Sequence, residues 1–268
     1  MPIHCPIALP RLSETEMKEI DYQVMAHAFA AHRDLGRFCD EAIYQADLAE
    51  RLAAVSLGLV HRELPITASF CGFVHSYFPD LVVAECAIYE LKADATLTPA
   101  HEAQLLNYLL LANAARGKLI NFRPASVESR FVNAPLDHAA RHDFAVHRDT
   151  RATDDSFVSL VVDLVSDWGT GLETALYVRA LTHVLGGDEV VIRQLPMTRA
   201  GHSLGNQRFH LAAPETAFIL TSYSLVEALQ QTHLNRLLEA SPLARLIWVN
   251  IALHDLTFTA IDRRSRLI

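Results

Sequence analysis

The 268-residue sequence lacks several features that would place it in a familiar class of protein. No apolar run approaches the roughly 18 to 20 residues of a membrane-spanning helix, so we expect no membrane span. The first residues lack the basic and apolar segments of a secretory signal peptide. None of the four cysteines forms a CxxC pair, so zinc or dithiol redox sites of that spacing are not expected. The expected location is the reducing cytoplasm.

Positive charge is also scarce. The chain has 23 Lys and Arg against 31 Asp and Glu, a net charge of −8. This balance disfavours a protein that coats nucleic acid with a basic surface, although it does not exclude an enzyme with a small basic cleft. With 51% hydrophobic and 20% charged residues, the chain should fold as a globular protein of one large or two small domains.

The first half alternates between helical and strand patterns. Two segments with helical spacing precede three short β-rich runs, a third helix and a final buried strand. The expected helices are residues 17–33, 39–58 and 98–115, and the expected strands are residues 59–70, 75–85, 87–93 and 117–122. The predicted order is α-α-β-β-β-α-β, which gives a small mixed sheet flanked by helices.

The second half repeats this order. Four matched pairs lie 133, 131, 130 and 129 positions apart, namely Tyr44 with Tyr177, Pro65 with Pro196, Ala87 with Ala217 and Asn121 with Asn250. A slowly drifting offset is what a duplication with a few insertions and deletions produces. The alternative is that two α/β units share a generic rhythm. We predict two domains, residues 1–145 and 146–268, linked through the polar stretch 133–156.

Two charges interrupt the apolar run at residues 86–93. Glu90 and Lys92 are two positions apart, so in a strand they project to the same side. A hairpin would bring Asp80, from the preceding run, beside Glu90. Two carboxylates and an ammonium group suit Mg²⁺ and phosphodiester hydrolysis. By spacing alone, however, an exposed polar row with a turn aspartate is the better explanation, because such a pattern is common by chance.

Five ordered segments between residues 20 and 132 make the pattern more specific. They are "AHRDLGRFCDEAIYQADL", "RELPI", "FPDLVVAECAIYELKA", "LTPAHEAQLLNYL" and "GKLINF". In order and content they resemble the GxxExxY family of the PD-(D/E)xK nuclease superfamily. The resemblance implies a restriction-endonuclease-like fold, in two tandem domains if the repeat holds. It also implies a Mg²⁺ or Mn²⁺ cofactor and a nucleic acid substrate.

The resemblance assigns roles to five residues. Asp80 and Glu90 match the metal-binding acids, and Lys92 matches the catalytic lysine. Glu41 matches the helix glutamate that would add a carboxylate to the metal site. Gln104 matches a glutamine that faces the site from the next helix.

One departure from the family pattern concerns the loop before Glu41. Phe38 occupies the place of the family's second glycine, although Gly36 is kept, so we expect the loop that enters the Glu41 helix to differ from that of the family. Tyr44, one turn later, is expected to pack or to orient Glu41.

Other motifs are incomplete. The sequence "HEAQL" at His101 lacks the second histidine of HExxH, because position 105 is Leu105. The glycines near Gly169 lack the Lys-Ser/Thr of a phosphate-binding loop, and the serines form no nucleophile elbow.

The second copy has lost the polar set. Local offsets carry Glu41, Asp80, Glu90, Lys92 and Gln104 onto Thr174, His210, Leu220, Ser222 and His233. Glu173 lies one residue from the first of these places, so a shifted helix would restore a single acid. We therefore predict an inactive second domain that serves the first as an intramolecular pseudo-subunit, with further homo-oligomerisation undecided.

The predicted function is a metal-dependent phosphodiester hydrolase acting on DNA or RNA, with water as the nucleophile. The alternative is a non-enzymatic regulatory protein that binds nucleic acid or protein on a nuclease fold, which the acidic net charge favours. A third hypothesis is hydrolysis of a small nucleotide. The sequence does not distinguish DNA from RNA or the strandedness of the substrate.

Overall fold

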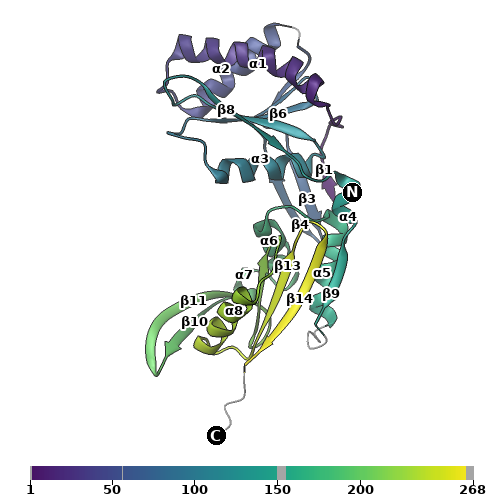
Figure 1. Ribbon diagram of the computed structural model, residues 1–268, viewed down its shortest axis with the longest axis vertical. Helices are drawn as coiled ribbons and strands as arrows, with labels where there is room; N and C mark the ends of the chain where they lie inside the picture. The colour runs from purple at the N-terminus through teal and green to yellow at the C-terminus, as the bar shows by residue number, and fades with distance from the viewer. Residues whose placement is uncertain (1, 56, 150–154, 264–268) are drawn as a thin grey trace. The chain divides into compact units, whose positions relative to one another are not determined.

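The computed structural model describes residues 2–55, 57–149 and 155–263 as an α/β protein with eight helices and three β-sheets (Figure 1). The helices are α1 (Glu14–Leu35), α2 (Glu41–Ala54), α3 (Pro99–Leu111), α4 (His138–His142), α5 (Asp155–Trp168), α6 (Thr174–Val184), α7 (Asp188–Val191) and α8 (Ala228–Ala240). The strands are β1 (Ile3–His4), β2 (Val60–Arg62), β3 (Ile66–Phe70), β4 (Phe73–Tyr77), β5 (Leu81–Val83), β6 (Ala87–Lys92), β7 (Arg116–Asn121), β8 (Glu128–Asn133), β9 (Ala145–Arg148), β10 (Ile192–Arg199), β11 (His202–Ala213), β12 (Thr216–Thr221), β13 (Arg245–Ile251) and β14 (Asp255–Asp262). None of the helices described is both long and apolar enough to span a bilayer.

The chain divides into two compact units. The first comprises Met1–Ser69 and Val74–Ala139, and the second comprises Phe70–Phe73 and Ala140–Ile268. The polar stretch that we predicted as a link contains helix α4 and strand β9, and its residues 150–154 lie outside the described part of the chain.

The first unit is built on a five-stranded sheet of order β2-β5-β6-β7-β8. All neighbours are antiparallel except β6 and β7, which are parallel and are connected through α3. Ala87, Tyr89 and Leu91 of β6 belong to the core cluster formed with α1 and α2. Because side chains alternate along a strand, Glu90 and Lys92 project to the opposite face. Helix α3 packs against β7 and β8.

Two predicted strands are in fact pairs of strands. Residues 59–70 form β2 and β3, which are separated by Glu63 in a left-handed conformation (φ 51°) and by Pro65. Residues 75–85 form β4 and β5 with Pro79 between them, because proline has no N–H for a ladder hydrogen bond. Strand β3 lies between β1 and β4 in a separate three-stranded sheet.

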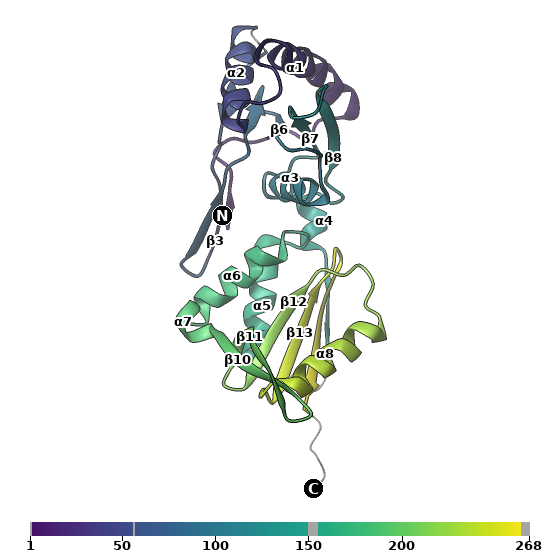
Figure 2. The same ribbon diagram turned by 90° about the vertical axis from the view of Figure 1, so that its left-hand side faces the viewer.

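The second unit contains a six-stranded sheet of order β10-β11-β12-β13-β14-β9. From β10 to β14 the successive pairs are antiparallel, antiparallel, parallel and antiparallel, as they are from β2 to β8 in the first unit. Helix α8 connects the parallel pair and lies across this sheet, where it contacts β10, β13 and β14 (Figure 2). The first five strands of this sheet therefore repeat the topology of the first unit.

Candidate active site

Strands β5 and β6 bring two acids together. Leu81 is opposite Tyr89 in this antiparallel pair, so Asp80 and Glu90 are the next residues along each strand. The backbone N–H of Leu91 donates to Asp80 Oδ2 at 2.7 Å. The N–H of Asp80 lies 3.4 Å from Glu90 Oε2, which accepts from it. The predicted hairpin therefore forms, and each carboxylate contacts the backbone of the other residue's strand.

Lys92 completes this cluster. Its Nζ donates to Glu90 Oε1 at 2.9 Å and lies 3.7 Å from Glu41 Oε1. Glu90 is 2% exposed and Lys92 is 7% exposed, whereas the Glu41 side chain is 40% exposed. The two charges that appeared out of place in an apolar strand thus form a buried ion pair, with Glu41 at its solvent-facing side.

Glu41 owes its position to the start of helix α2. Asp40 is the N-cap residue, and Glu41 is the first residue of the helix, where the helix dipole favours a carboxylate. Tyr44 does not join the cluster. Its ring stacks on Phe122 with centroids 4.4 Å apart, and its hydroxyl donates to the carbonyl of Gly36 at 2.8 Å. Tyr44 therefore packs, as expected, and ties the start of α2 to the end of α1.

Gln104 lies on α3, and within the described residues its side chain forms neither a hydrogen bond nor an ion pair with Asp80, Glu90 or Lys92. Its Nε2 donates to the hydroxyl of Tyr108, one turn later, at 3.0 Å. Burial raises the pKa of Tyr108, and the nearby carboxylate of Glu90 raises it further. Gln104 is therefore linked to the acids only indirectly, through Tyr108, which we did not predict.

Gln45 is a second residue that the sequence analysis missed. Its side-chain amide donates to the backbone carbonyl of Asp80 at 3.0 Å and accepts from Arg62 at 3.1 Å. Gln45 is four residues after Glu41 and Tyr108 is four residues after Gln104, so each shares a helix face with a predicted residue. This helical spacing is the signal that would have found both.

Burial makes both acids unusually weak. Burial raises the pKa of Asp80 to about 6, partly opposed by the Leu91 hydrogen bond and by Lys92. Burial and the neighbouring Asp80 raise the pKa of Glu90 to about 7, although Lys92 opposes the shift. Burial alone would lower the pKa of Lys92, but its carboxylate neighbours, Glu90 first, outweigh this and raise it. Near neutral pH the cluster therefore holds a charged lysine beside carboxylates that are costly to ionise.

These carboxylates fit a divalent cation in their chemistry. Oxygen ligands are what Mg²⁺ and Mn²⁺ prefer, and a cation would offset the burial that raises both pKa values. Over the described residues, however, no three His, Cys, Asp or Glu side chains are grouped as a metal-ligand set. Asp80 and Glu90 would hold the ion, and Glu41 would have to move from Lys92 to join them.

The mixed α/β fold is consistent with a known superfamily. Residues 18–133 match the family model of the PD-(D/E)XK nuclease superfamily. The match bears out the superfamily that the sequence segments resembled, and it suggests nuclease activity for this part of the chain. PD-(D/E)XK nucleases generally use divalent metal ions.

Two further comparisons add little. A solved structure titled "Crystal structure of SSO0001" is 26% identical, covers 47% of this chain and 61% of its own, and has a TM-score of 0.28. This chain thus spans less than two thirds of that structure's length. No curated protein matches the chain.

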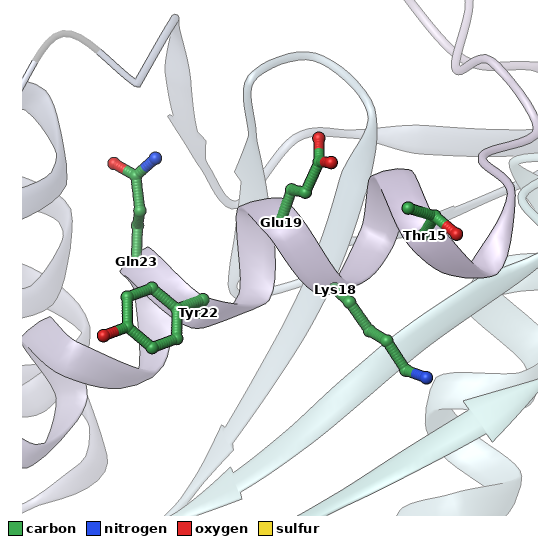
Figure 3. Close-up of a pocket in the computed structure, with 5 residues that line it drawn as sticks. All are labelled: Thr15, Lys18, Glu19, Tyr22 and Gln23. Atoms are coloured by element: carbon green, nitrogen blue, oxygen red, sulfur yellow. The ribbon is translucent and has the colours of Figure 1, made fainter.

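A separate hollow lies on α1. Its lining side chains spread along one helix and do not converge on a point (Figure 3). They are Thr15, Lys18, Glu19, Tyr22 and Gln23. Lys18 is paired with Glu14 at 2.7 Å, and no predicted site residue lines the hollow. This surface offers no arrangement for the chemistry considered above.

Proposed function

We propose that residues 1–145 form a metal-dependent phosphodiester hydrolase that cleaves DNA or RNA. The observation that carries the proposal is the convergence of Asp80, Glu90 and Lys92, three residues from two strands, in one largely buried cluster. Buried acids with raised pKa values beside a paired lysine are typical of functional sites rather than of an exposed polar row.

Each residue has a role that follows from its position. Asp80 and Glu90 are the metal ligands, and a bound Mg²⁺ or Mn²⁺ would polarise the phosphodiester and lower the pKa of the attacking water. Lys92 holds the attacking water or the charge that develops on the phosphoryl oxygens. Glu41 adds a carboxylate at the entrance. Gln104 acts with Tyr108 in orienting water or phosphate.

We further propose that the chain belongs to the GxxExxY family and that residues 146–268 are a degenerate copy of the first domain. A matching hydrogen bond at the same place in each unit supports the duplication. Tyr177 donates to the carbonyl of Gly169 at 2.5 Å, eight residues earlier, as Tyr44 does to Gly36. Both glycines follow a helix and have nearly equal φ values, 72° and 74°.

A second matching contact involves an asparagine of the parallel strand. Asn121 exchanges two hydrogen bonds with the backbone of Asp94, at 2.8 and 3.1 Å. Asn250 exchanges two with the backbone of Tyr223, at 3.0 and 2.8 Å. Each asparagine lies 27 residues after its partner. Equal spacing and equal atoms argue against a merely generic rhythm.

This contact changes the residue pairing that we expected in β12. Lys92 is opposite Asn121, and Thr221 is opposite Asn250. Lys92 therefore corresponds to Thr221 and Glu90 to Ile219, one residue before the predicted Ser222 and Leu220. Since neither replacement is a carboxylate or an amine, the corrected pairing still supports an inactive second copy.

The start of α6 bears on the place of Glu173 in the second copy. Helix α6 begins at Thr174 as α2 begins at Glu41, and Glu173 is the N-cap residue, as Asp40 is. Glu173 thus corresponds to Asp40 and not to Glu41. It is paired with Arg179 at 3.1 Å.

Two substitutions test the hydrolase directly. Glu90→Gln and Lys92→Met should each abolish Mg²⁺- or Mn²⁺-dependent cleavage of a panel of single- and double-stranded DNA and RNA. The small diester bis(p-nitrophenyl) phosphate belongs in the panel, because it reports chemistry without a large binding surface. Wild-type protein that cleaves no member of the panel with either metal would refute the proposal.

Lys118→Met is the matched control. Lys118 is also buried in the sheet and ion-paired, with Asp21 at 2.6 Å, but on the face covered by α1. It should lower the melting temperature and leave cleavage by the folded protein unchanged. If it lost cleavage as Lys92→Met did, the effect would be structural.

The second candidate function is a non-enzymatic binding protein on the same fold. The net charge of −8 favours it, because a nuclease usually gains from cationic steering. Calorimetric titration with Mn²⁺ separates the two candidates: the hydrolase binds the ion and loses binding on Glu90→Gln, whereas the binding protein takes up no ion at this cluster.

A further inference from the structure

The hairpin β10–β11 is the longest pair of strands in the described part of the chain (Figure 1). Most of its residues are exposed or half-buried. Its register runs from Ile192 opposite His210 to Arg199 opposite His202, with a bulge between Met197 and Thr198. Every residue from Gly201 to Arg208 is exposed. We refer to residues 192–213 as the ribbon.

The ribbon carries only positive charge in an acidic chain. It contains three arginines and two histidines and no Asp or Glu, whereas the whole chain has a net charge of −8. Arg193 donates to the carbonyl of Glu189 and so caps α7. Arg199 and Arg208 are exposed, and neither makes an ion pair within the described residues. Such charge is free to meet an anionic partner.

The two faces of the ribbon differ. Leu195, Met197 and Phe209 pack into the apolar cluster that includes residues of α8. Arg208 is opposite Gln194 in the ladder, and Asn206 is opposite Pro196, so these side chains alternate onto the other face. That outer face therefore presents an arginine, a glutamine and an asparagine, all three exposed.

A hollow between the tip of the ribbon and α8 extends the positive surface. Arg199 and Arg236 both line it, together with one acid, Glu239. The remaining lining residues, Thr198, Ala200, Gly201 and Ala240, are small. Arg236 is exposed and makes no ion pair in the described chain. Two unpaired arginines at a shallow hollow of small residues suit a phosphate group.

We infer that the outer face of the ribbon docks in the major groove of duplex DNA, with Arg199 and Arg236 on the flanking phosphates. Two strands about 4.8 Å apart fit a groove about 12 Å wide. Arginine pairs with guanine edges, and asparagine and glutamine pair with adenine edges. The inference rests on the proposed function and narrows its substrate to DNA duplexes, held by the unit that lacks the catalytic residues.

The geometry of the partner excludes the other nucleic acids. The major groove of an RNA duplex is deep and narrow, so a ribbon does not enter it. A single strand has no groove, and its binding relies on aromatic side chains that stack on bases. The three exposed side chains that we assign to the outer face, Gln194, Asn206 and Arg208, include no aromatic ring. Duplex DNA is therefore expected to bind at least about tenfold more tightly than duplex RNA or single strands.

The test is fluorescence anisotropy on the full chain in EDTA, which keeps binding separate from cleavage. The probe is a labelled DNA duplex of about 25 base pairs, roughly two helical turns. The triple variant Arg199→Gln/Arg208→Gln/Arg236→Gln should weaken binding at least about tenfold. It should also reduce the slope of log K against log salt by about 2, since Arg199 and Arg236 each contact a phosphate and each lost phosphate contact removes about 0.9.

The matched control removes the same charge elsewhere. Lys18→Gln/Arg33→Gln/Arg179→Gln changes three exposed residues whose side chains are 64%, 74% and 43% exposed. It should leave affinity within about twofold. Equal weakening by both triple variants would overturn the inference in favour of net charge alone. Equal affinity for duplex RNA and duplex DNA would overturn the inference that the ribbon docks in the major groove of DNA.

Failure of this inference can be told from failure of the proposed function. If the wild-type chain cleaves bis(p-nitrophenyl) phosphate with Mn²⁺ but does not bind duplex DNA in EDTA, DNA docking by the ribbon is refuted and the hydrolase proposal is supported. A chain that binds duplex DNA through the three arginines but cleaves nothing refutes the hydrolase and supports the ribbon.

Discussion

Replacing Glu90 with glutamine should stabilise the first unit at alkaline pH while it removes a proposed metal ligand. Burial moves the pKa of Glu90 from 4.5 to about 7. Between pH 4.5 and about 7, Glu90 is protonated in the folded state but ionised in the unfolded state. The free energy of unfolding therefore falls as the pH rises through this range. At about 1.4 kcal/mol for each pKa unit, the loss is about 3 kcal/mol, an upper figure because Asp80 titrates with Glu90.

Hydrogen exchange of peptides from β6 and β7 measures the unfolding free energy of this unit separately from the other. Glutamine mimics the protonated form of Glu90, and Lys92 keeps its ion pair with Glu41. Glu90→Gln should therefore equal the wild type at pH 4.5 and exceed it by up to about 3 kcal/mol at pH 8. Glu50→Gln, an exposed change on α2, should show no pH-dependent difference. Destabilisation by Glu90→Gln at pH 8, or the same effect at both pH values, would refute the reasoning.

Three further predictions follow from the same contacts. Because Asp80 and Glu90 must lose their protons to bind metal, calorimetric Mn²⁺ affinity should fall about a hundredfold or more from pH 8 to pH 5, and a constant affinity would contradict this. Tyr44→Phe and Tyr177→Phe should each cost about 1 kcal/mol in urea unfolding, and unequal losses well beyond error would argue against equivalent bonds. Gln45→Ala should lower kcat with little change in KM, since Gln45 positions Asp80; a rise in KM alone would assign it to binding.

The cluster at β5 and β6 was predictable from the sequence because its geometry is local. Glu90 and Lys92 share a face by strand alternation alone, and a short hairpin leaves few positions for Asp80. The superfamily resemblance then removed the ambiguity between a buried site and a polar edge. The position of Glu41 depends on where the second helix begins, and the helix begins at Glu41, two residues later than we predicted.

Other features depend on distant contacts that no short pattern contains. Gln104 lies one turn from Tyr108, and only packing of α3 decides which of the two approaches Glu90. Strands β3 and β4 form a sheet of their own because β3 pairs with β1, at residues 3–4, where we predicted no strand. The correspondence between Lys92 in the first copy and Thr221 in the second could be established only from the asparagine contacts. The apolar residues of β12 align with those of β6 almost equally well in either of two registers.

The bonds between Asn121 and Asp94 also bear on where the protein would accept added sequence. They hold the chain in place just after β6 ends at Lys92. On the other side of the turn, the N–H of Leu97 donates to Glu128 at 3.3 Å. Ala95 and Thr96, between these anchors, are exposed. A peptide tag or fluorophore site inserted there should leave the Lys92 amine in place, which makes this turn a suitable point for attaching a reporter close to the proposed active site.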